Sequence, residues 1–333
     1  MSQKRIMVTG ALGFVGAHLV EHLLKNTDWE IVAVDKLNYA SVGFERLRDI
    51  NAYDDKRIKI FTSPIDRPIN ESLEKEIGQV DYIAHLAAES HVDNSITNPE
   101  PFIQSNIIGT YQVLEFARRQ DHLEKMLMFS TDEVYGPAPK GVNHTENDRH
   151  LPANPYAATK SAGEQLCLAW ANTYKLPVFV SNTMNVYGER QHPEKFIPLV
   201  IRRVLSGEKV YIHGTPDKQE AGSRFYIHGR NVADAVLFLM HHETPARSAW
   251  NIVGEKEIDN LSLAQFIAQV IGKPLNYEIV DFHSSRPGHD LRYALDGTKM
   301  KNAGWVPPVN FEASLEKTIQ WIIDPKNKRW LEI

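Results

Sequence analysis

A glycine-rich turn near the N-terminus constrains this chain more than any other feature of its sequence. In the segment 8–16, Val-Thr-Gly-Ala-Leu-Gly-Phe-Val-Gly, the glycines at 10, 13 and 16 follow directly on a strand-like run. In this pattern the first glycine permits a tight turn, the second lets the backbone approach a pyrophosphate, and the third allows close packing of helix on strand. The next helix would present its N–H groups and positive dipole end to phosphates. The turn therefore predicts a dinucleotide site.

An acidic residue on the next predicted strand supports this prediction. Asp35 follows the apolar run 31–34, where a carboxylate can accept a hydrogen bond from a ribose 2′-hydroxyl and would repel a 2′-phosphate. We therefore expect NAD as the cofactor rather than NADP, although the neighbouring Lys36 tempers the repulsion. A glycine turn without a ligand is the alternative, and the placement of Asp35 argues against it.

The order of the remaining elements predicts the fold class. Short β-rich runs alternate with helical periods, which indicates a parallel sheet with crossover helices. Strands are expected at 5–8, 30–34, 58–62, 82–86, 126–129 and 178–181, and helices at 14–24, 101–119 and 156–174. We predict an α/β fold with a Rossmann-type doubly wound parallel sheet at 1–187. A smaller, interleaved α/β substrate lobe should follow at 188–333, with segments near 225–253 returning to the first domain.

Composition narrows the class of protein. The 333 residues carry a formal net charge of −5, so there is no basic footprint for nucleic acid. The longest strongly apolar stretch, 235–240, is far shorter than the roughly 20 residues that a membrane helix needs. The N-terminus lacks the regions of a signal peptide, and the single cysteine, Cys167, fits a reducing compartment. We expect a cytoplasmic enzyme without nucleic acid, membrane or metal partners, because no His/Cys/Asp set has zinc spacing.

A tyrosine and a lysine share one face of a predicted helix. Tyr156 and Lys160 stand one helical turn apart. An adjacent cation stabilises phenolate and can lower the tyrosine pKa from about 10 by about 1–3 units. Tyr156 is therefore a candidate base at neutral pH. The pair alone is a weak signal, and it gains weight from the glycine turn upstream.

A hydroxyl and two carboxylates follow another predicted strand. Thr131, Asp132 and Glu133 come directly after the run 126–129, and ligands of open α/β sheets bind beyond the carboxyl ends of strands. Two carboxylates in different surroundings can differ in pKa, so that one serves as acid and the other as base. Hydride transfer alone does not need both. Capping of a turn is the alternative interpretation of Ser130 and Asp132.

Together these motifs resemble the extended short-chain dehydrogenase/reductases, and most of all the dTDP-glucose 4,6-dehydratases. The likeness runs through 8–16, 35–37, 85–93, 131–136, 156–160, 193–198 and 286–293. Residues 131–133 distinguish the dehydratases from the sugar 4-epimerases of the superfamily, which usually lack this carboxylate pair. The resemblance implies a nucleotide-sugar substrate, tightly bound NAD and a homodimer formed through helices 101–119 and 156–174.

The resemblance also implies roles for individual residues. Tyr156 would take the sugar O4 proton during C4 oxidation, Glu133 would remove the C5 proton, and Asp132 would protonate the departing C6 hydroxyl. Hydride would then return to C6, while Thr131 would bond O4 and Lys160 would hold the nicotinamide ribose. The implied cofactor contacts are Gly10, Gly13, Phe14, Val15, Gly16, Asp35, Lys36, Leu37, Asn38, Ile65, Leu86, Ala87, Ala88, Glu89, Ser105, Tyr156 and Lys160. The implied substrate contacts are Ser90, Thr131, Asn185, Lys195, Phe196, Tyr211, Arg224, Asn251, Arg286 and His289.

Departures from the dehydratase pattern leave the substrate open. Ser63-Pro64-Ile65 stands where the family usually has Gly-Asp-Ile, Asn94 replaces a usual arginine, and 214–227 is longer than expected. The base and sugar could be those of dTDP-glucose, UDP-glucose or a related hexose. A UDP-sugar 4-epimerase or decarboxylase is the rival enzyme. A dinucleotide-sensing regulatory protein is a more distant alternative.

Overall fold

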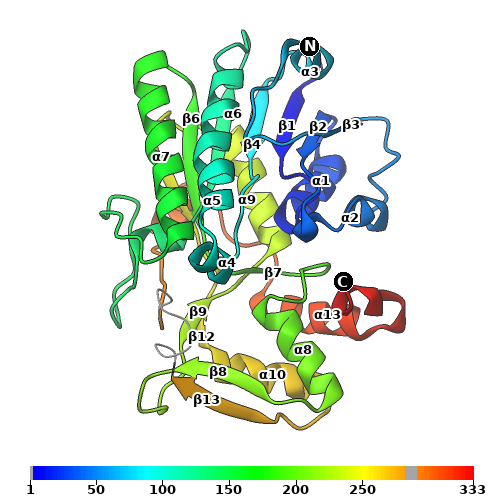
Figure 1. Ribbon diagram of the computed structural model, residues 1–333, viewed down its shortest axis with the longest axis vertical. Helices are drawn as coiled ribbons and strands as arrows, with labels where there is room; N and C mark the ends of the chain where they lie inside the picture. The colour runs from blue at the N-terminus through cyan, green and yellow to red at the C-terminus, as the bar shows by residue number, and fades with distance from the viewer. Residues whose placement is uncertain (1–2, 282–290) are drawn as a thin grey trace.

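A seven-stranded parallel sheet forms the centre of the computed structural model, which describes residues 3–281 and 291–333 (Figure 1). The strand order is β11-β6-β5-β4-β1-β2-β3. The order reverses between β1 and β4, and ligands of such sheets bind at this point, outside the carboxyl ends of the strands. The prediction of a Rossmann-type doubly wound sheet is confirmed. The strands are β1 (Arg5–Thr9), β2 (Glu30–Asp35), β3 (Ile58–Thr62), β4 (Tyr82–His85), β5 (Lys125–Thr131), β6 (Val178–Thr183) and β11 (Ala249–Ile252).

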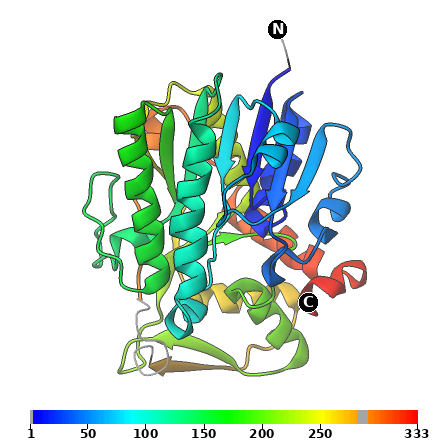
Figure 2. The ribbon, with the colours of Figure 1, turned by 45° about the horizontal axis from the view of Figure 1, so that its top comes forward.

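Apolar side chains cover both faces of this sheet. Ile6 and Val8 of β1 point into one core and Met7 into the other, as the alternation of a strand requires. The first core is closed by α1 (Phe14–Asn26), α2 (Glu45–Asp49), α9 (Gly229–His241) and α12 (Thr298–Asn302). The second is closed by α3 (Glu71–Ile77), α6 (Gly109–Ala117) and α7 (Pro155–Tyr174), and the last two lie side by side in Figure 2. Burial on both faces explains why the strands read as nearly continuous apolar runs.

The helix predicted at 101–119 is interrupted. It consists of α5 (Glu100–Phe102), a π-helical segment η2 (Ile103–Ile108) and α6. Within η2 the side chain of Asn106 is buried, and it both accepts from the Glu89 N–H at 2.9 Å and donates to the Glu89 carbonyl at 3.0 Å. The wider turn thus fixes the chain after β4, and such π-turns are frequent at functional sites.

The second half of the chain builds a separate layer below the sheet (Figure 1). It contains three two-stranded sheets and a third apolar core around α8 (Phe196–Ser206), α10 (Asn260–Ile271) and α13 (Phe311–Ile323). The paired strands are β7 (Val186–Tyr187) with β10 (Ile227–His228), β8 (Val210–Gly214) with β13 (Tyr277–Asp281), and β9 (Ser223–Phe225) with β12 (Glu257–Asp259). Between these pairs the chain returns to the large sheet, because α9 packs on α1 and β11 pairs with β6.

Four short helices complete the described fold. They are η1 (Tyr39–Ser41), α4 (Val92–Thr97), η3 (Asp132–Tyr135) and η4 (Pro325–Leu331). Within residues 3–281 and 291–333, none of the helices has both the length and the apolar character that a membrane crossing demands.

Candidate active site

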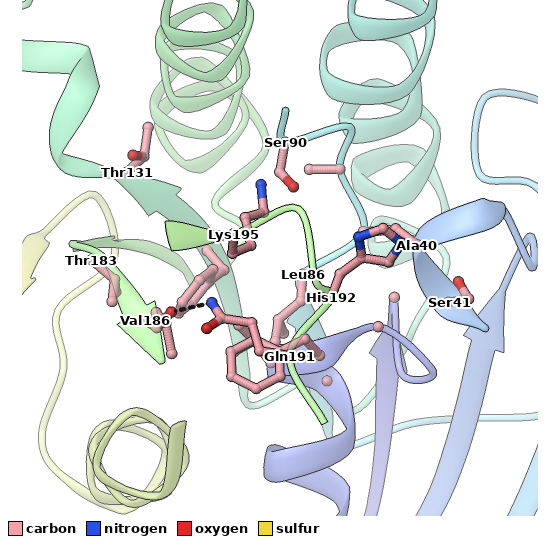
Figure 3. A pocket seen from close by; sticks show the side chains of 18 of the residues that line it. Ala40, Ser41, Leu86, Ser90, Thr131, Thr183, Val186, Gln191, His192 and Lys195 are labelled. Atoms are coloured by element: carbon pink, nitrogen blue, oxygen red, sulfur yellow. Dashed lines mark hydrogen bonds between the residues drawn. The ribbon is translucent and has the colours of Figure 1, made fainter. Parts of the chain in front are cut away.

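A pocket of about 380 Å³ lies at the switch point of the sheet. Its walls are the carboxyl ends of β1, β2, β4 and β5, the start of α1 and α7, and the loop 184–197 of the second layer. Figure 3 shows Gln191, His192 and Lys195, from the segment after β7, among Leu86, Ser90 and Thr131, which stand at or after the ends of β4 and β5. The pocket therefore draws on both parts of the fold.

The glycine turn leaves space and free backbone at one end of this pocket. Gly10 has a φ of +69°, and a Cβ there would lie 2.8 Å from the backbone of Ala87. A Cβ on Gly16 would lie 2.1 Å from the Gly10 carbonyl oxygen, so the helix could not approach the strand as it does. Gly13 caps α1, and no side chain of the described residues accepts from the helix N-terminus. The uncapped N-terminus fits the phosphates of a dinucleotide.

Asp35 organises the adjoining loops. Its carboxylate accepts from the Leu12 N–H at 3.0 Å, the Leu37 N–H at 2.9 Å and the Ser41 hydroxyl at 2.8 Å. It therefore holds the glycine turn against the loop after β2, a structural role beyond the ribose contact expected from the sequence. Lys36, expected to temper the charge of Asp35, instead pairs with Glu89 at 2.6 Å.

Most residues expected to contact the cofactor line the pocket. Leu37 and Glu89 are the exceptions. Leu37 has a φ of +57° and packs against the apolar core. Glu89 lies behind the wall, where it accepts from Lys36 and from the Asn38 amide at 3.2 Å. The expected residues that line the pocket are Gly10, Gly13, Phe14, Val15, Gly16, Asp35, Lys36, Asn38, Ile65, Leu86, Ala87, Ala88, Ser105, Tyr156 and Lys160.

The chain turns sharply at the end of β5. Thr131 is the last residue of the strand, and its hydroxyl accepts from the Glu133 N–H at 3.4 Å and donates to Asp132 Oδ1 at 3.0 Å. The sequence left open that Ser130 or Asp132 caps this turn. The residue that caps it is Thr131. All three side chains from 131 to 133 line the pocket.

The two carboxylates occupy different surroundings. Asp132 is 5% exposed, and its Oδ2 has no hydrogen-bond partner among the described residues. Burial, and then the charge of Glu133, raise the pKa of Asp132 to about 7. Glu133 is half-buried and accepts from the Asn154 amide at 2.8 Å. One member of the pair can therefore carry a proton near neutral pH beside a hydrogen-bonded carboxylate, an arrangement suited to acid and base roles.

Tyr156 and Lys160 both line the pocket from the first turns of α7. Burial, and then the charge of Glu133, raise the pKa of Tyr156, while a hydrogen bond from Thr131 opposes the rise. Lys160 donates to the Phe129 carbonyl at 2.6 Å, and burial lowers its pKa to about 8. The expectation that Lys160 lowers the tyrosine pKa stays a prediction for the cofactor-bound protein, because without cofactor the ammonium faces a carbonyl and the phenol lies near carboxylates.

A third carboxylate, which the sequence prediction did not include, lies next to Lys160 on α7. Glu164 continues the face of Tyr156 and Lys160 one turn further along α7. It accepts from the Ser130 hydroxyl and from the Asn182 amide at 2.9 Å, and burial raises its pKa to about 7. The repeated four-residue spacing was the available signal. Glu164 does not itself line the pocket. The lining residues that the sequence prediction missed include Arg46, Met184, Gln191, His192 and Tyr226.

The residues expected on the substrate side divide into two groups. Ser90, Asn185, Lys195 and Phe196 line the pocket together with Thr131. Tyr211 does not, because β8 places it on the surface, where it is 46% exposed.

Two more expected substrate contacts are engaged elsewhere. Asn251 is buried in β11 and donates to the carbonyls of His144 at 3.0 Å and Asp296 at 3.2 Å. Arg224 donates to the Leu291 carbonyl at 2.6 Å, outside the pocket lining, although its charge acts on the nearby Asp132. Arg286 and His289 lie outside the described residues. Elsewhere in the described chain, no three His, Cys, Asp or Glu side chains are placed to hold a metal ion.

Known proteins resemble this chain in sequence and fold. The family model described as "NAD dependent epimerase/dehydratase family" matches residues 6–253. A dTDP-glucose 4,6-dehydratase of Escherichia coli is 38% identical, with 98% of this chain and 94% of the relative covered. A dTDP-glucose 4,6-dehydratase of Streptomyces venezuelae, solved with NAD, superposes with a TM-score of 0.88 at 32% identity, covering 98% of this chain and 99% of that one. A UDP-glucuronic acid 4-epimerase of Bacillus cereus, also solved with NAD, reaches 0.86 at 25% identity, covering 96% and 98%.

Proposed function

The chain belongs to the NAD dependent epimerase/dehydratase family, and from this premise we propose that it is a nucleotide-sugar 4,6-dehydratase. Its substrate is dTDP-glucose or a related nucleoside-diphosphate hexose, and its product is the 4-keto-6-deoxy sugar. The reaction removes one water and leaves the cofactor in its starting state. NAD is held through the cycle by the glycine turn, Asp35 and the walls formed after β4.

One observation carries this proposal: the carboxylate pair at the end of β5. Removal of water across C5 and C6 needs a base for the C5 proton and an acid for the C6 hydroxyl. Asp132 is buried with a pKa of about 7, and Glu133 beside it is held by the Asn154 amide. An epimerase, which inverts C4 and eliminates nothing, has no use for such a pair.

The first step belongs to Tyr156 and Thr131. Tyr156, ionised when Lys160 and bound NAD bring positive charge to the phenol, accepts the proton of the sugar O4. The Thr131 hydroxyl, within hydrogen-bonding reach of Tyr156, orients O4 and polarises the resulting ketone. When bound, NAD supplies the hydride acceptor for C4 and the hydride donor for C6, and its oxidised ring adds positive charge to the pocket. Lys160 binds the cofactor ribose with the ammonium that otherwise faces the Phe129 carbonyl.

The second step belongs to the carboxylates. The C4 ketone acidifies the C5–H, and Glu133 accepts that proton while Asn154 keeps its carboxylate oriented. Asp132 gives its proton to the C6 oxygen, which leaves as water. Glu133 then returns a proton to C5 as C6 is reduced. General acid–base assistance of this kind typically contributes about 10²–10⁴-fold to the rate.

A mass-spectrometric panel tests the proposal. The purified protein, without added cofactor, is incubated with dTDP-glucose, UDP-glucose, CDP-glucose, GDP-mannose, UDP-N-acetylglucosamine and UDP-glucuronate. We expect one nucleotide sugar to lose one water, which also identifies the base. If one substrate instead loses CO₂, or keeps its mass and becomes an isomer that chromatography separates, the chain is a decarboxylase or a 4-epimerase and the role given to the carboxylate pair is wrong.

Two broader properties complete the proposal. The chain acts as a homodimer, because the exposed Tyr111 of α6 and Tyr174 of α7 contact the Trp170 ring and form an aromatic surface across neighbouring helices. It works in the cytoplasm, since Cys167 is a buried free thiol. Light scattering on the purified chain tests the first property, and Tyr111→Lys should release monomers. A wild-type monomer at all concentrations would contradict the dimer.

A further inference from the structure

Arg46 is a buried cation that the proposed reaction does not use. It belongs to α2, is 1% exposed and lines the pocket. Burial lowers its pKa to about 10. A buried charge is costly unless it is hydrogen-bonded, and Nε and Nη1 of this guanidinium have acceptors while Nη2 has no partner among the described residues.

The Arg46 guanidinium donates to backbone carbonyls from three segments of the chain. Nη1 donates to Leu12 in the glycine turn at 3.2 Å, and to Ala40 and Ser41 in the loop after β2 at 2.7 and 2.9 Å. Nε donates to the Arg190 carbonyl at 3.0 Å. The rigid fork of arginine suits several acceptors at once, which a lysine ammonium on a flexible stem cannot match in geometry.

All three segments border the pocket. The glycine turn and the loop after β2 bound the end assigned to NAD. The carbonyl of Arg190 belongs to the loop 188–195, which comes from the second layer and carries Gln191, His192 and Lys195 into the pocket (Figure 3). Arg46 therefore links the glycine turn and the loop after β2 to the loop 188–195.

Further contacts hold the same loop to the cofactor side. The side chain of Arg190 pairs with Asp49 of α2 at 3.1 Å and with Glu21 of α1 at 3.3 Å. The His192 ring meets the Tyr39 ring edge-on, with centroids 5.5 Å apart. The backbone and side chain of Arg190 thus both connect the loop to helices that flank the glycine turn.

We infer that Arg46 is a positioning residue that couples occupation of the cofactor end of the pocket to occupation of the nucleotide end. When a dinucleotide orders the glycine turn, Arg46 holds the loop 188–195 where Lys195 meets the nucleotide. When a nucleotide orders the loop, Arg46 holds the turn closed on the dinucleotide. The coupling is reciprocal, as linkage requires. The inference rests on the proposed function, because it takes NAD and a nucleoside diphosphate as the two occupants.

NAD exchange from the holoenzyme tests the inference. Bound NAD is displaced by an excess of its fluorescent ethenoadenine analogue, with and without dTDP, which lacks the sugar and permits no reaction. In the wild type we expect dTDP to slow the exchange by about fivefold or more, the lower range of measured couplings. In Arg46→Lys the exchange should be faster, and dTDP should change it by less than about twofold. Arg48→Lys, an exposed neighbour on α2, is the matched control and should behave as wild type.

A second variant reaches the same junction without touching Arg46. Asp49→Asn weakens the anchor of Arg190, and it should reduce the dTDP effect to a value between those of wild type and Arg46→Lys. Asp49 also pairs with Arg329 at 2.7 Å, so Arg329→Gln is its control.

Two results would overturn the inference. One is an equal dTDP effect in wild type and Arg46→Lys or, if that variant does not fold, in wild type and Asp49→Asn. The other is no effect in a wild type that binds both ligands. A wild type that binds neither NAD nor any nucleotide of the panel would instead overturn the proposed function.

Discussion

The side chain of Asn154 joins the start of α7 to the carboxylate of Glu133. Its oxygen caps the helix by accepting from the Ala157 N–H at 2.8 Å, and its nitrogen donates to Glu133 Oε2 at 2.8 Å. One amide therefore fixes both the helix that carries Tyr156 and the proposed base. The relative placement of Tyr156 and Glu133 thus depends on a residue that does not itself line the pocket.

Replacing this amide should separate its two tasks. Asn154→Asp keeps a good helix cap, so the melting temperature should change little. The new carboxylate cannot donate to Glu133 and repels its charge, so the proposed base loses the hydrogen bond that holds it. We expect the rate of water loss to fall by roughly tenfold or more. A rate equal to that of the wild type would show that the Asn154 amide does not orient the base.

Neutral substitutions of the carboxylates should stop elimination and spare oxidation. Asp132→Asn and Glu133→Gln keep the shape of the site, so Tyr156 can still accept the O4 proton. Water loss should fall by about 10²–10⁴-fold in each variant. Reduced cofactor should accumulate on mixing with substrate, visible by its absorbance. If Tyr156→Phe accumulates it equally, oxidation does not depend on the phenol.

The burial of Asp132 should make stability depend on pH. Its pKa of about 7 lies above the ordinary value of about 3.9, so the folded chain binds this proton more tightly than the unfolded chain. The stability that it contributes is complete below pH ~4 and lost as the pH rises through about 7. Asp132→Asn should therefore gain about 1–3 kcal/mol in unfolding free energy between pH 5 and 8, relative to wild type. Denaturant titrations at both pH values measure this gain, and a constant difference would contradict the burial argument.

The glycine turn should tolerate no side chain at Gly10. Gly10→Ala combines a positive φ with a Cβ 2.8 Å from the Ala87 backbone. We expect a loss of about 1–3 kcal/mol in unfolding free energy and purified protein that carries little NAD. Gly141→Ala is the matched control, because its φ of +80° imposes similar strain with nothing within 4 Å of the new Cβ. Equal NAD content in the two variants would mean that backbone strain, not contact at the pocket, decides the outcome.

Local patterns in the sequence were enough to predict most strands of the large sheet, the glycine turn and the residues at the end of β5. These features depend on neighbours in the chain, so spacing and hydrophobic alternation reveal them. The interruption of the helix at η2 depends on Asn106 reaching Glu89, a contact that no local pattern encodes.

The residues that the sequence prediction missed or placed elsewhere have hydrogen-bond partners far away along the chain. Arg46 stands in the charged run Glu-Arg-Leu-Arg-Asp, yet it is buried and donates to the carbonyls of Leu12 and Arg190. Asn251, which the resemblance assigns to the substrate side, instead donates with its amide nitrogen to the carbonyls of His144 and Asp296.

The chain returns to the large sheet after the second layer has begun. This path limits where the chain can be cut into fragments that fold. A fragment ending at residue 187 would lack α9 and β11, leaving β6 as an open edge and the apolar face of α1 uncovered. Open edges and bare apolar faces favour aggregation. The second layer therefore cannot be exchanged by joining a new C-terminal half. Recombination between relatives with different substrates would have to preserve residues 229–252 with the host sheet.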